Sequence, residues 1–242
     1  MQISEARHTT REDAVVAGEQ TYIVIAAYNE GEAIGPVLEA IVGRFAGVLV
    51  VDDGSKDDTA AIARASGATV IVHPVNLGQG AALQTGITYA LRSGADFIVT
   101  FDADGQHDAD DVPAMIAALR STGAEIAIGS RFLEGAKTNA TRSRRILLKA
   151  ATVFTRLTTG LKVTDAHNGL RVITSAGARK LFIRQNRMAH ASEILEQISA
   201  RDIPFVECPV HIRYTDYSRT KGQSGFESIN ILIDLLMQRL KS

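Results

Sequence analysis

Short apolar runs alternate with amphipathic segments along the first half of the chain. The apolar runs are rich in Val and Ile and cover residues 21–27, 47–53, 69–73, 96–104 and 125–130. Such runs are typical of strands buried on both faces of a parallel sheet. Between them, apolar residues recur at helical spacing, and the first set is Ile34, Val37, Leu38, Ile41 and Val42. This alternation predicts an α/β fold with a Rossmann-like, mostly parallel sheet and helices on both faces.

The pattern is less regular in the second half of the chain. The elements expected there are a basic amphipathic stretch over 142–162, a strand over 170–174, helices over 175–183 and 191–200, a strand over 205–214 and an apolar helix over 226–242. Pro209 indicates an edge or bulged position for the last strand. In the first half, Ser55 and Asp58 match a capping box that would open the second helix. Residues 1–20 show no sustained periodicity and are predicted to be a flexible tail.

Composition and charge narrow the class of protein. Of the 242 residues, 45% are hydrophobic and 22% are charged, and the formal net charge is -1. A chain of this charge has no basic field, so nucleic acid is not expected as a partner. The single cysteine, Cys208, allows no intrachain disulfide and fits a reducing compartment. Since no apolar signal segment or membrane-spanning run is found, we expect a cytoplasmic location, with binding to the inner face of the membrane still open.

Polar clusters follow three of the predicted strands. They are Tyr28, Asn29 and Glu30 after the first strand, Asp52, Asp53, Gly54 and Ser55 after the second, and Asp102, Ala103 and Asp104 after the fourth. Ligands of open parallel sheets bind beyond the carboxyl ends of the strands. Taken singly, each cluster fits helix capping equally well. Three clusters at one edge predict a ligand site.

The sharpest cluster is the acid pair Asp102 and Asp104 in FDADGQH (101–107). Alternate residues of an extended segment point the same way, so both carboxylates can face one side. Two close acids repel each other unless a cation lies nearby, and Mg²⁺ or Mn²⁺ favours a few carboxylates with phosphate oxygens. Such an ion would help a diphosphate to leave. The alternative is an acidic turn before a helix, which is the better interpretation for Asp108, Asp110 and Asp111.

Two common nucleotide-binding motifs are missing from the sequence. No G-x-G-x-x-G follows the first strand and no G-x-x-x-x-G-K-[ST] is present, so a dinucleotide site and a P-loop are not expected. The glycine-containing turn NLGQGAAL (76–83) would let backbone approach a ligand closely, or would simply start a helix.

Taken together, the motifs resemble those of a known family. AAYNE (26–30), VVDDGSKDDT (50–59), NLGQGAAL (76–83), FDADGQH (101–107) and GSRF (129–132) resemble, in order and spacing, the family 2 glycosyltransferases. The branch that they resemble includes dolichyl-phosphate mannose synthase and polyprenyl-phosphate glycosyltransferases. This resemblance implies a GT-A fold, a UDP- or GDP-hexose donor and inversion at the anomeric carbon. It implies one domain over 21–225, with 21–130 binding the nucleotide sugar and 131–225 forming the acceptor side.

The same resemblance assigns the site residues. It implies a donor site of Ala27, Tyr28, Glu30, Asp53, Gly80, Asp102, Ala103 and Arg131, a metal site of Asp102, Asp104 and Gln106, and catalytic roles for Asp104, Asp165 and Arg219. Asp165, Asn168 and Arg171 match the family segment D-x-Q-x-G-[FL]-R near the acceptor, with His167-Asn168 departing from it. Asp165 is a candidate general base or acceptor-orienting group, or else caps a turn. Arg131 or Arg219 would stabilise the departing phosphates.

A loop near the C-terminus also matches the family. RTKGQSG, with Arg219, Gly222 and Ser224, resembles the R-x-x-G-x-S-K loop that closes over the diphosphate. Gly225 stands where the lysine is usual, and Lys221 is a candidate substitute.

The basic stretch suggests where the acceptor is met. It carries Arg142, Arg144, Arg145, Lys149, Arg156 and Lys162 among Ile146, Leu147, Leu148, Val153, Phe154 and Leu157. A basic amphipathic helix can lie in the headgroup region of an anionic bilayer. Alternatively, it packs on the core, or the C-terminal helix forms a homodimer contact. With the resemblance, we expect a polyprenyl-phosphate acceptor, reached by surface binding or through a small membrane-protein partner.

Other functions stay open on the sequence. The acceptor could instead be a soluble sugar or a protein hydroxyl. The chain could also be a nucleotide-sugar-binding module without catalysis, or a haloacid-dehalogenase-like phosphatase, because DADGQ resembles the start of the D-x-D motif of those enzymes.

Overall fold

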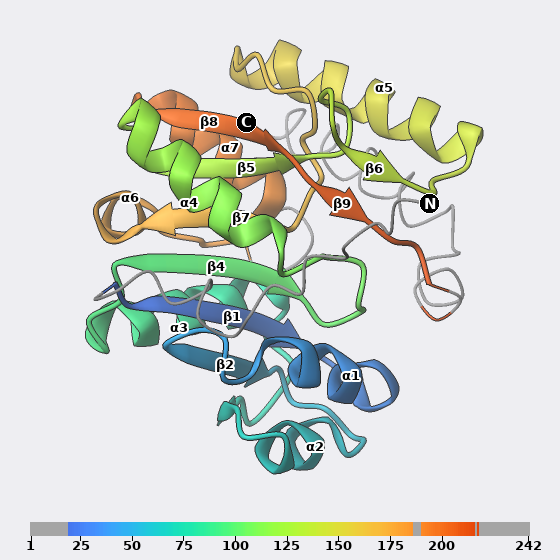
Figure 1. Ribbon diagram of the computed structural model, residues 1–242, viewed down its shortest axis with the longest axis vertical. Helices are drawn as coiled ribbons and strands as arrows, with labels where there is room; N and C mark the ends of the chain where they lie inside the picture. The colour runs from blue at the N-terminus through green and yellow to red at the C-terminus, as the bar shows by residue number, and fades with distance from the viewer. Residues whose placement is uncertain (1–18, 186–189, 216, 218–242) are drawn as a thin grey trace, which may run out of the picture.

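A seven-stranded mixed sheet forms the centre of the protein, with strand order β3-β2-β1-β4-β7-β5-β8 (Figure 1). The computed structural model describes residues 19–185, 190–215 and 217. The strands are β1 (Thr21–Ala27), β2 (Gly47–Asp52), β3 (Thr69–Val72), β4 (Phe97–Asp102), β5 (Ile126–Ser130), β6 (Lys137–Thr138), β7 (Arg171–Thr174), β8 (Phe205–Pro209) and β9 (His211–Ile212). Strand β7 runs antiparallel to both of its neighbours, whereas the other paired strands of this sheet are parallel.

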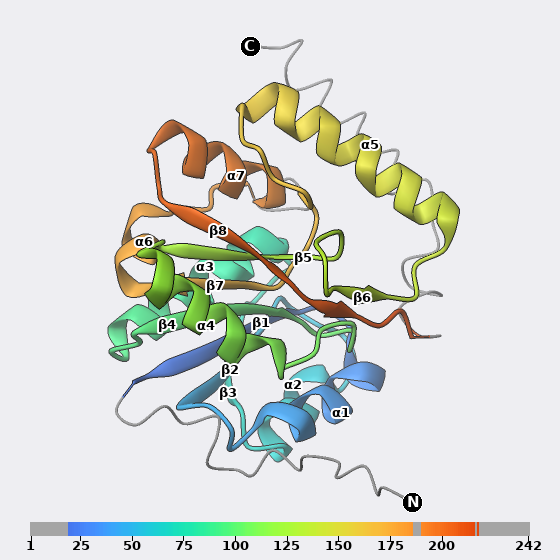
Figure 2. The same ribbon diagram turned by 45° about the horizontal axis from the view of Figure 1, so that its top comes forward.

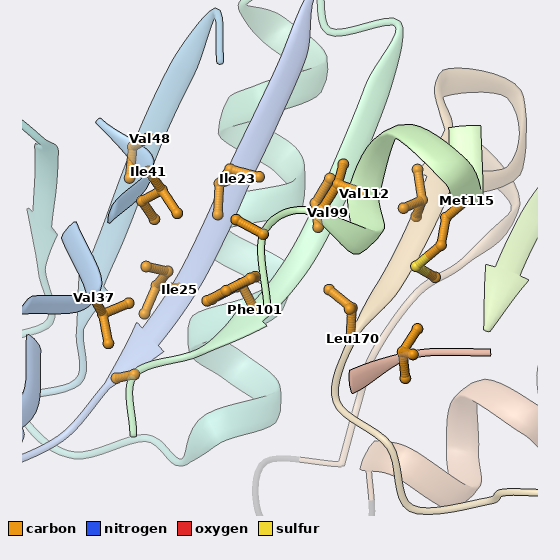
Figure 3. Close-up of a cluster of buried hydrophobic side chains, with 14 of the residues drawn as sticks. Ile23, Ile25, Val37, Ile41, Val48, Val99, Phe101, Val112, Met115 and Leu170 are labelled. Carbon is orange, nitrogen blue, oxygen red and sulfur yellow. The ribbon is translucent and has the colours of Figure 1, made fainter. Parts of the chain in front are cut away.

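Helices cover both faces of the sheet because the strands are apolar on both sides. The helices are α1 (Gly31–Ile41), α2 (Thr59–Ala65), α3 (Gln79–Arg92), α4 (Asp111–Thr122), α5 (Arg142–Thr159), α6 (Ser175–Lys180) and α7 (His190–Ala200). One buried cluster joins the sheet to α1, α2 and α4, and the other joins it to α3, α6 and α7. Figure 3 shows the first cluster, in which Ile23 and Val99 of neighbouring strands meet Ile41 and Val112 of the helices. The predicted α/β architecture is confirmed.

Three predicted boundaries are wrong. Helix α2 begins at Thr59, so Ser55 and Asp58 form no capping box; the Ser55 amide instead donates to Asp52 Oδ1 at 2.9 Å. Strand β4 ends at Asp102, and the chain turns directly after it. The helix predicted over 175–183 ends at Lys180.

The strand predicted over 205–214 is two strands in different sheets. Strand β8 ends at Pro209 on the edge of the main sheet, and β9 pairs with β6 in a separate two-stranded sheet. Proline cannot donate to a ladder, and the next amide, from Val210, donates to the carbonyl of Ser130. The edge position that Pro209 indicated is confirmed. The predicted helix over 226–242 and the tail over residues 1–18 lie outside the described residues.

Helix α5 stands apart from the sheet. It packs against α7 and extends away from the other helices (Figures 1 and 2). Only Thr152 and Thr155 of this helix are fully buried. Its outer face is therefore one of the most exposed parts of the described structure.

Candidate active site

The three predicted polar clusters meet at one edge of the sheet. Ala27 of β1 pairs with Asp52 of β2, and Ala26 pairs with Asp102 of β4, so the carboxyl ends of the three strands are level. Strands β2 and β4 lie on opposite sides of β1, so the chain continues from β1 to one side of the sheet and later crosses to the other. This is the topological switch point, where open α/β sheets bind their ligands.

The loop after β1 is fastened to the loop after β2. Asn29 adopts a left-handed conformation with φ 52°, its amide donates to Ser55 Oγ at 2.9 Å, and its Oδ1 accepts from the Lys56 amide at 2.8 Å. The Glu30 amide donates to Thr59 Oγ1 at 2.8 Å. These bonds fix the backbone at the start of α1, next to Ala27 at the end of β1. The Tyr28 side chain is 40% exposed at this edge.

Asp53 organises the glycine-containing turn. Its buried carboxylate accepts from the amides of Leu77 at 2.9 Å and Gly78 at 2.6 Å, and it contacts His73 Nδ1 at 2.7 Å. Buried carboxylates need such partners, and three of them hold this one. The predicted nucleoside contact of Asp53 stays a prediction; the observed contacts show that Asp53 positions the turn before α3. Close packing also explains Gly80, since a side chain there would overlap the Gln185 carbonyl.

The acid pair lies at the end of β4, with Ala103 buried between its two members. His107 Nε2 lies 2.8 Å from Asp102 Oδ2, and Gln106 donates to Asp104 through both its amide and its side chain. Burial opposes the ionisation of Asp102, yet its pKa is lowered because His107 and other positive groups lie close by. Burial and the negative charge of Asp102 raise the pKa of Asp104.

The segment before β7 packs against the acid pair. Thr100 Oγ1 donates to the Gly169 carbonyl at 2.6 Å, and a methyl group on Gly169 would overlap the Asp102 carboxylate. Arg171 is fully buried near Asp102 and Asp165, and its Nε has no hydrogen-bond partner among the described residues. A side chain at 169 would therefore displace the Asp102 carboxylate, and the charge of Arg171 balances the acids around it.

Asp165 and Arg131 form a buried ion pair. Arg131 Nε lies 2.5 Å from Asp165 Oδ2, and both side chains are almost fully buried. The remaining nitrogens of Arg131 donate to Tyr214 Oη at 2.7 Å and to the His167 carbonyl at 3.1 Å. Burial disfavours the charge on Arg131, but Asp165 and Tyr214 raise its pKa, so the guanidinium stays charged. Each guanidinium nitrogen of Arg131 thus makes one hydrogen bond within the protein, and both oxygens of Asp165 accept hydrogen bonds there.

This geometry changes the roles predicted for the pair. The structure places Asp165 and Arg131 together, although 34 residues separate them in the chain. A carboxylate held in a buried ion pair is a poor general base, and a buried arginine that already pairs with a carboxylate is a poor phosphate ligand. The contacts observed here support a positioning role for both residues. Arg219, Gly222, Ser224, Lys221 and Gly225 lie outside the described residues, so the roles predicted for them are untested.

Two histidines of the site were not predicted from the sequence. His107 lies inside the FDADGQH motif and contacts Asp102, while His73 ends the third predicted strand and contacts Asp53. Each lies at the end of a motif or strand that the sequence did reveal. Their pairing with Asp102 and Asp53 could not be predicted, because a histidine near acidic residues in the sequence can equally be a core residue.

The acid pair would contribute to a divalent-ion site only together with a ligand. Across the described residues, no three His, Cys, Asp or Glu side chains converge on one point, so a cation here would need oxygens from elsewhere. Asp102 and Asp104 would supply carboxylates, and a diphosphate would supply the rest. The raised pKa of Asp104 fits this arrangement, because a bound cation would remove the repulsion between the two acids.

The fold and the site together define the protein as a GT-A glycosyltransferase. The defining features are the parallel half-sheet β3-β2-β1-β4, the D-x-D acid pair at its carboxyl edge, and the antiparallel strand β7 beside it. The sequence model described as glycosyl transferase family 2 matches residues 22–182. The chain belongs to that family. The haloacid-dehalogenase-like alternative is therefore wrong.

Relatives along the whole chain are consistent with this assignment. An uncharacterised protein of Methanocaldococcus jannaschii is 34% identical over 92% of this chain and 93% of its own length. The UDP-N-acetylglucosamine–dolichyl-phosphate N-acetylglucosaminyltransferase of Methanococcus voltae is 30% identical over 93% of this chain and 98% of its own. The polyprenol monophosphomannose synthase of Mycolicibacterium smegmatis is 29% identical over 92% and 79%, respectively.

Solved structures show the same fold at low sequence identity. Glucosyl-3-phosphoglycerate synthase from Mycobacterium tuberculosis, in complex with phosphoglyceric acid, gives a TM-score of 0.70 at 21% identity, covering 94% of this chain and 82% of that one. A second structure of that enzyme contains Mn²⁺, UDP and glucosyl-3-phosphoglycerate, and gives a TM-score of 0.66 at 21% identity over 93% and 82%.

Proposed function

We propose that this enzyme transfers a hexose from a UDP- or GDP-sugar to a polyprenyl phosphate at the cytoplasmic face of a membrane, with inversion at the anomeric carbon. The observation that carries the proposal is the half-buried acid pair, Asp102 and Asp104, at the switch point of the sheet. Two of the relatives are named for dolichyl-phosphate or polyprenol acceptors, which supports an acceptor of this class.

The donor would lie along the carboxyl edge of β2, β1 and β4. Tyr28 and Glu30 border the nucleoside end, and Asp102, Asp104 and Gln106 would hold Mg²⁺ or Mn²⁺ at the diphosphate end. When bound, the cation supplies positive charge that stabilises the leaving diphosphate. The protein's own part is orientation: His107 holds one oxygen of Asp102, and Gln106 holds Asp104.

An acceptor that is already anionic suits this geometry. A phosphate oxygen would attack the anomeric carbon as the bond to the diphosphate breaks, and the diphosphate would leave with the electron pair on the opposite face. No proton has to be removed from an ionised phosphate, whereas a hydroxyl acceptor needs a base within hydrogen-bond reach. Asp165 is buried and paired with Arg131, so it is poorly placed to act as that base. This favours a phosphate acceptor.

A sugar-transfer assay with a defined lipid acceptor tests the proposal directly. The purified protein, Mn²⁺ and a panel of labelled UDP- and GDP-hexoses would be incubated with a short-chain polyprenyl phosphate, and label would be measured in the organic phase. We expect transfer from one donor and no label without the lipid. Label that appears on a soluble sugar or protein hydroxyl instead would contradict the acceptor assignment. Tight donor binding with no transfer and no hydrolysis would favour a non-catalytic module.

Helix α5 offers a surface that suits a membrane. Its outer face carries the exposed apolar side chains of Ile146, Val153 and Leu157, which are 70%, 52% and 79% exposed. These residues lie at helical spacing on the side opposite the buried Thr152 and Thr155. The neighbouring exposed basic residues are Arg142, Arg145, Lys149 and Arg156. An apolar stripe beside basic side chains fits an anionic bilayer surface. Among the described helices, none is long and apolar enough to cross a membrane.

Charge reversal on α5 should weaken membrane binding and leave the donor site intact. The variant Arg142→Glu/Arg145→Glu should lower the affinity for anionic liposomes at least about tenfold, because each basic residue contributes on the order of 1 kcal/mol. Arg144 is left unchanged because its guanidinium packs over the Tyr214 ring. The measurement is co-sedimentation at low and high salt, with calorimetry of the donor.

A matched control keeps the charge change and moves it elsewhere. Arg64→Glu/Arg92→Glu reverses two exposed charges on α2 and α3 and should bind liposomes like the wild type. Equal losses in both double variants would point to general electrostatics, and a wild type that ignores anionic liposomes would remove α5 from the proposal.

A further inference from the structure

Described residues that follow β9 contact the carboxyl edge of the sheet at two places. The amide of Arg213 donates to the Gln106 carbonyl at 2.9 Å, beside the acid pair. The backbone of Tyr214 is held by Asn139 through both its amide and its carbonyl. Tyr217 then reaches the loop after β1, where its hydroxyl donates to Glu30 Oε2 at 2.8 Å. Residues 187 positions apart thus meet at the nucleoside end of the edge.

We propose that Tyr217 is a positioning residue of the donor site, which orients the Glu30 carboxylate towards the nucleoside. The inference rests on the proposed function, because it needs a nucleoside diphosphate at this edge. No sequence motif pointed to Tyr217, which lies before the family-like loop that begins at Arg219.

The backbone and the side chain of Glu30 are fixed by different partners. The backbone is fixed by the bond from its amide to Thr59 Oγ1 at 2.8 Å. The side chain has several rotatable bonds, and ordering it on ligand binding would cost conformational entropy. The Tyr217 hydroxyl orders it beforehand. A carboxylate held in one orientation accepts hydrogen bonds from a ribose hydroxyl or a base N–H at lower cost, which raises affinity through preorganisation.

The setting of the bond favours a role in binding over a role in folding. Both side chains are only half-buried, and a single hydrogen bond between such groups contributes little to the stability of the fold. The bond instead spans the edge where the ligand is expected, between a residue at the switch point and a segment anchored at Gln106 and Asn139. Removal of the hydroxyl should therefore weaken ligand binding.

A double-mutant cycle tests this inference. Dissociation constants for UDP and GDP would be measured by calorimetry for the wild type, Tyr217→Phe, Glu30→Gln and the double variant. We expect Tyr217→Phe to weaken binding of the preferred diphosphate about fivefold, the size of one hydrogen bond, and the double variant to bind no worse than Glu30→Gln. The factor for Tyr217→Phe should be the same with and without Mn²⁺, because the ion acts at the diphosphate.

A control variant removes a tyrosine hydroxyl away from the proposed donor site. Tyr89→Phe removes a hydroxyl from a partly exposed tyrosine of α3 and should leave the dissociation constant unchanged. Unchanged binding in Tyr217→Phe, or losses that multiply in the double variant, would overturn the role of Tyr217 and leave the proposed function standing. A wild type that binds neither diphosphate would overturn both.

Discussion

Replacing Asp104 with asparagine should abolish sugar transfer while making the metal-free protein more stable. The negative charge of Asp104 is unfavourable in the fold, since burial and Asp102 raise its pKa. A neutral side chain removes this repulsion, and groups kept for function at a cost in stability behave in this way. We expect a loss of activity of at least about a hundredfold, because charge stabilisation at the diphosphate is lost. The measurements are transfer rates in Mn²⁺ and unfolding temperatures in EDTA.

Asp102 should be equally necessary for transfer but should behave differently in stability. Its carboxylate contacts His107 and lies near Arg171, so Asp102→Ala leaves positive groups without a partner and should lower the unfolding temperature. Asp110→Ala is the matched control, because Asp110 lies in the same acidic stretch but is exposed and pairs with Arg44. Full activity in EDTA, or in either variant of the acid pair, would contradict the metal site.

Replacing Asp165 with alanine should lower the stability of the fold strongly. The molecules that remain folded should keep most of their transfer rate. The change leaves the buried guanidinium of Arg131 without its carboxylate, and breaking a buried ion pair by removing one partner costs about 3–5 kcal/mol. Urea denaturation would measure the loss. The double variant Asp165→Ala/Arg131→Met removes both charges and should recover part of the stability.

The same variants decide between a base and a positioning residue. If Asp165 acted only as a base, its removal would lower the transfer rate without a large effect on stability. If Asp165→Ala folds as stably as the wild type and yet loses all transfer to a hydroxyl acceptor, Asp165 is the base and the acceptor is not a phosphate.

The features that could be predicted from the sequence are local ones. The buried strands and the acid pair were found because apolar runs and a D-x-D segment are properties of neighbouring residues. The roles of side chains at strand ends were harder to predict, because one residue can either cap a turn or face a ligand. Asp53 shows this: its position was correctly expected at the edge, but its carboxylate binds the amides of Leu77 and Gly78.

What could not be predicted depends on pairings between distant segments. The ion pair of Asp165 with Arg131 and the bond from Tyr217 to Glu30 form only once the less regular second half is folded onto the sheet. The division of the segment 205–214 into β8 and β9 has the same cause. The proline was visible in the sequence, but the separate partner of β9, which is β6, was not.

The reversed direction of β7 sets where this architecture can vary. An antiparallel strand presents its amino end at the edge where its parallel neighbours present their carboxyl ends, so the chain reaches the acid pair before β7 and not after it. Residues added ahead of Gly169, whose packing against Asp102 must be kept, would extend the edge that carries the acid pair. Residues added directly after Thr174 would extend the opposite edge of the sheet, beside the start of β4. Changes in the length of the chain that leads into β7 therefore act at the edge that carries the acid pair, while β1, β2 and β4 keep their register.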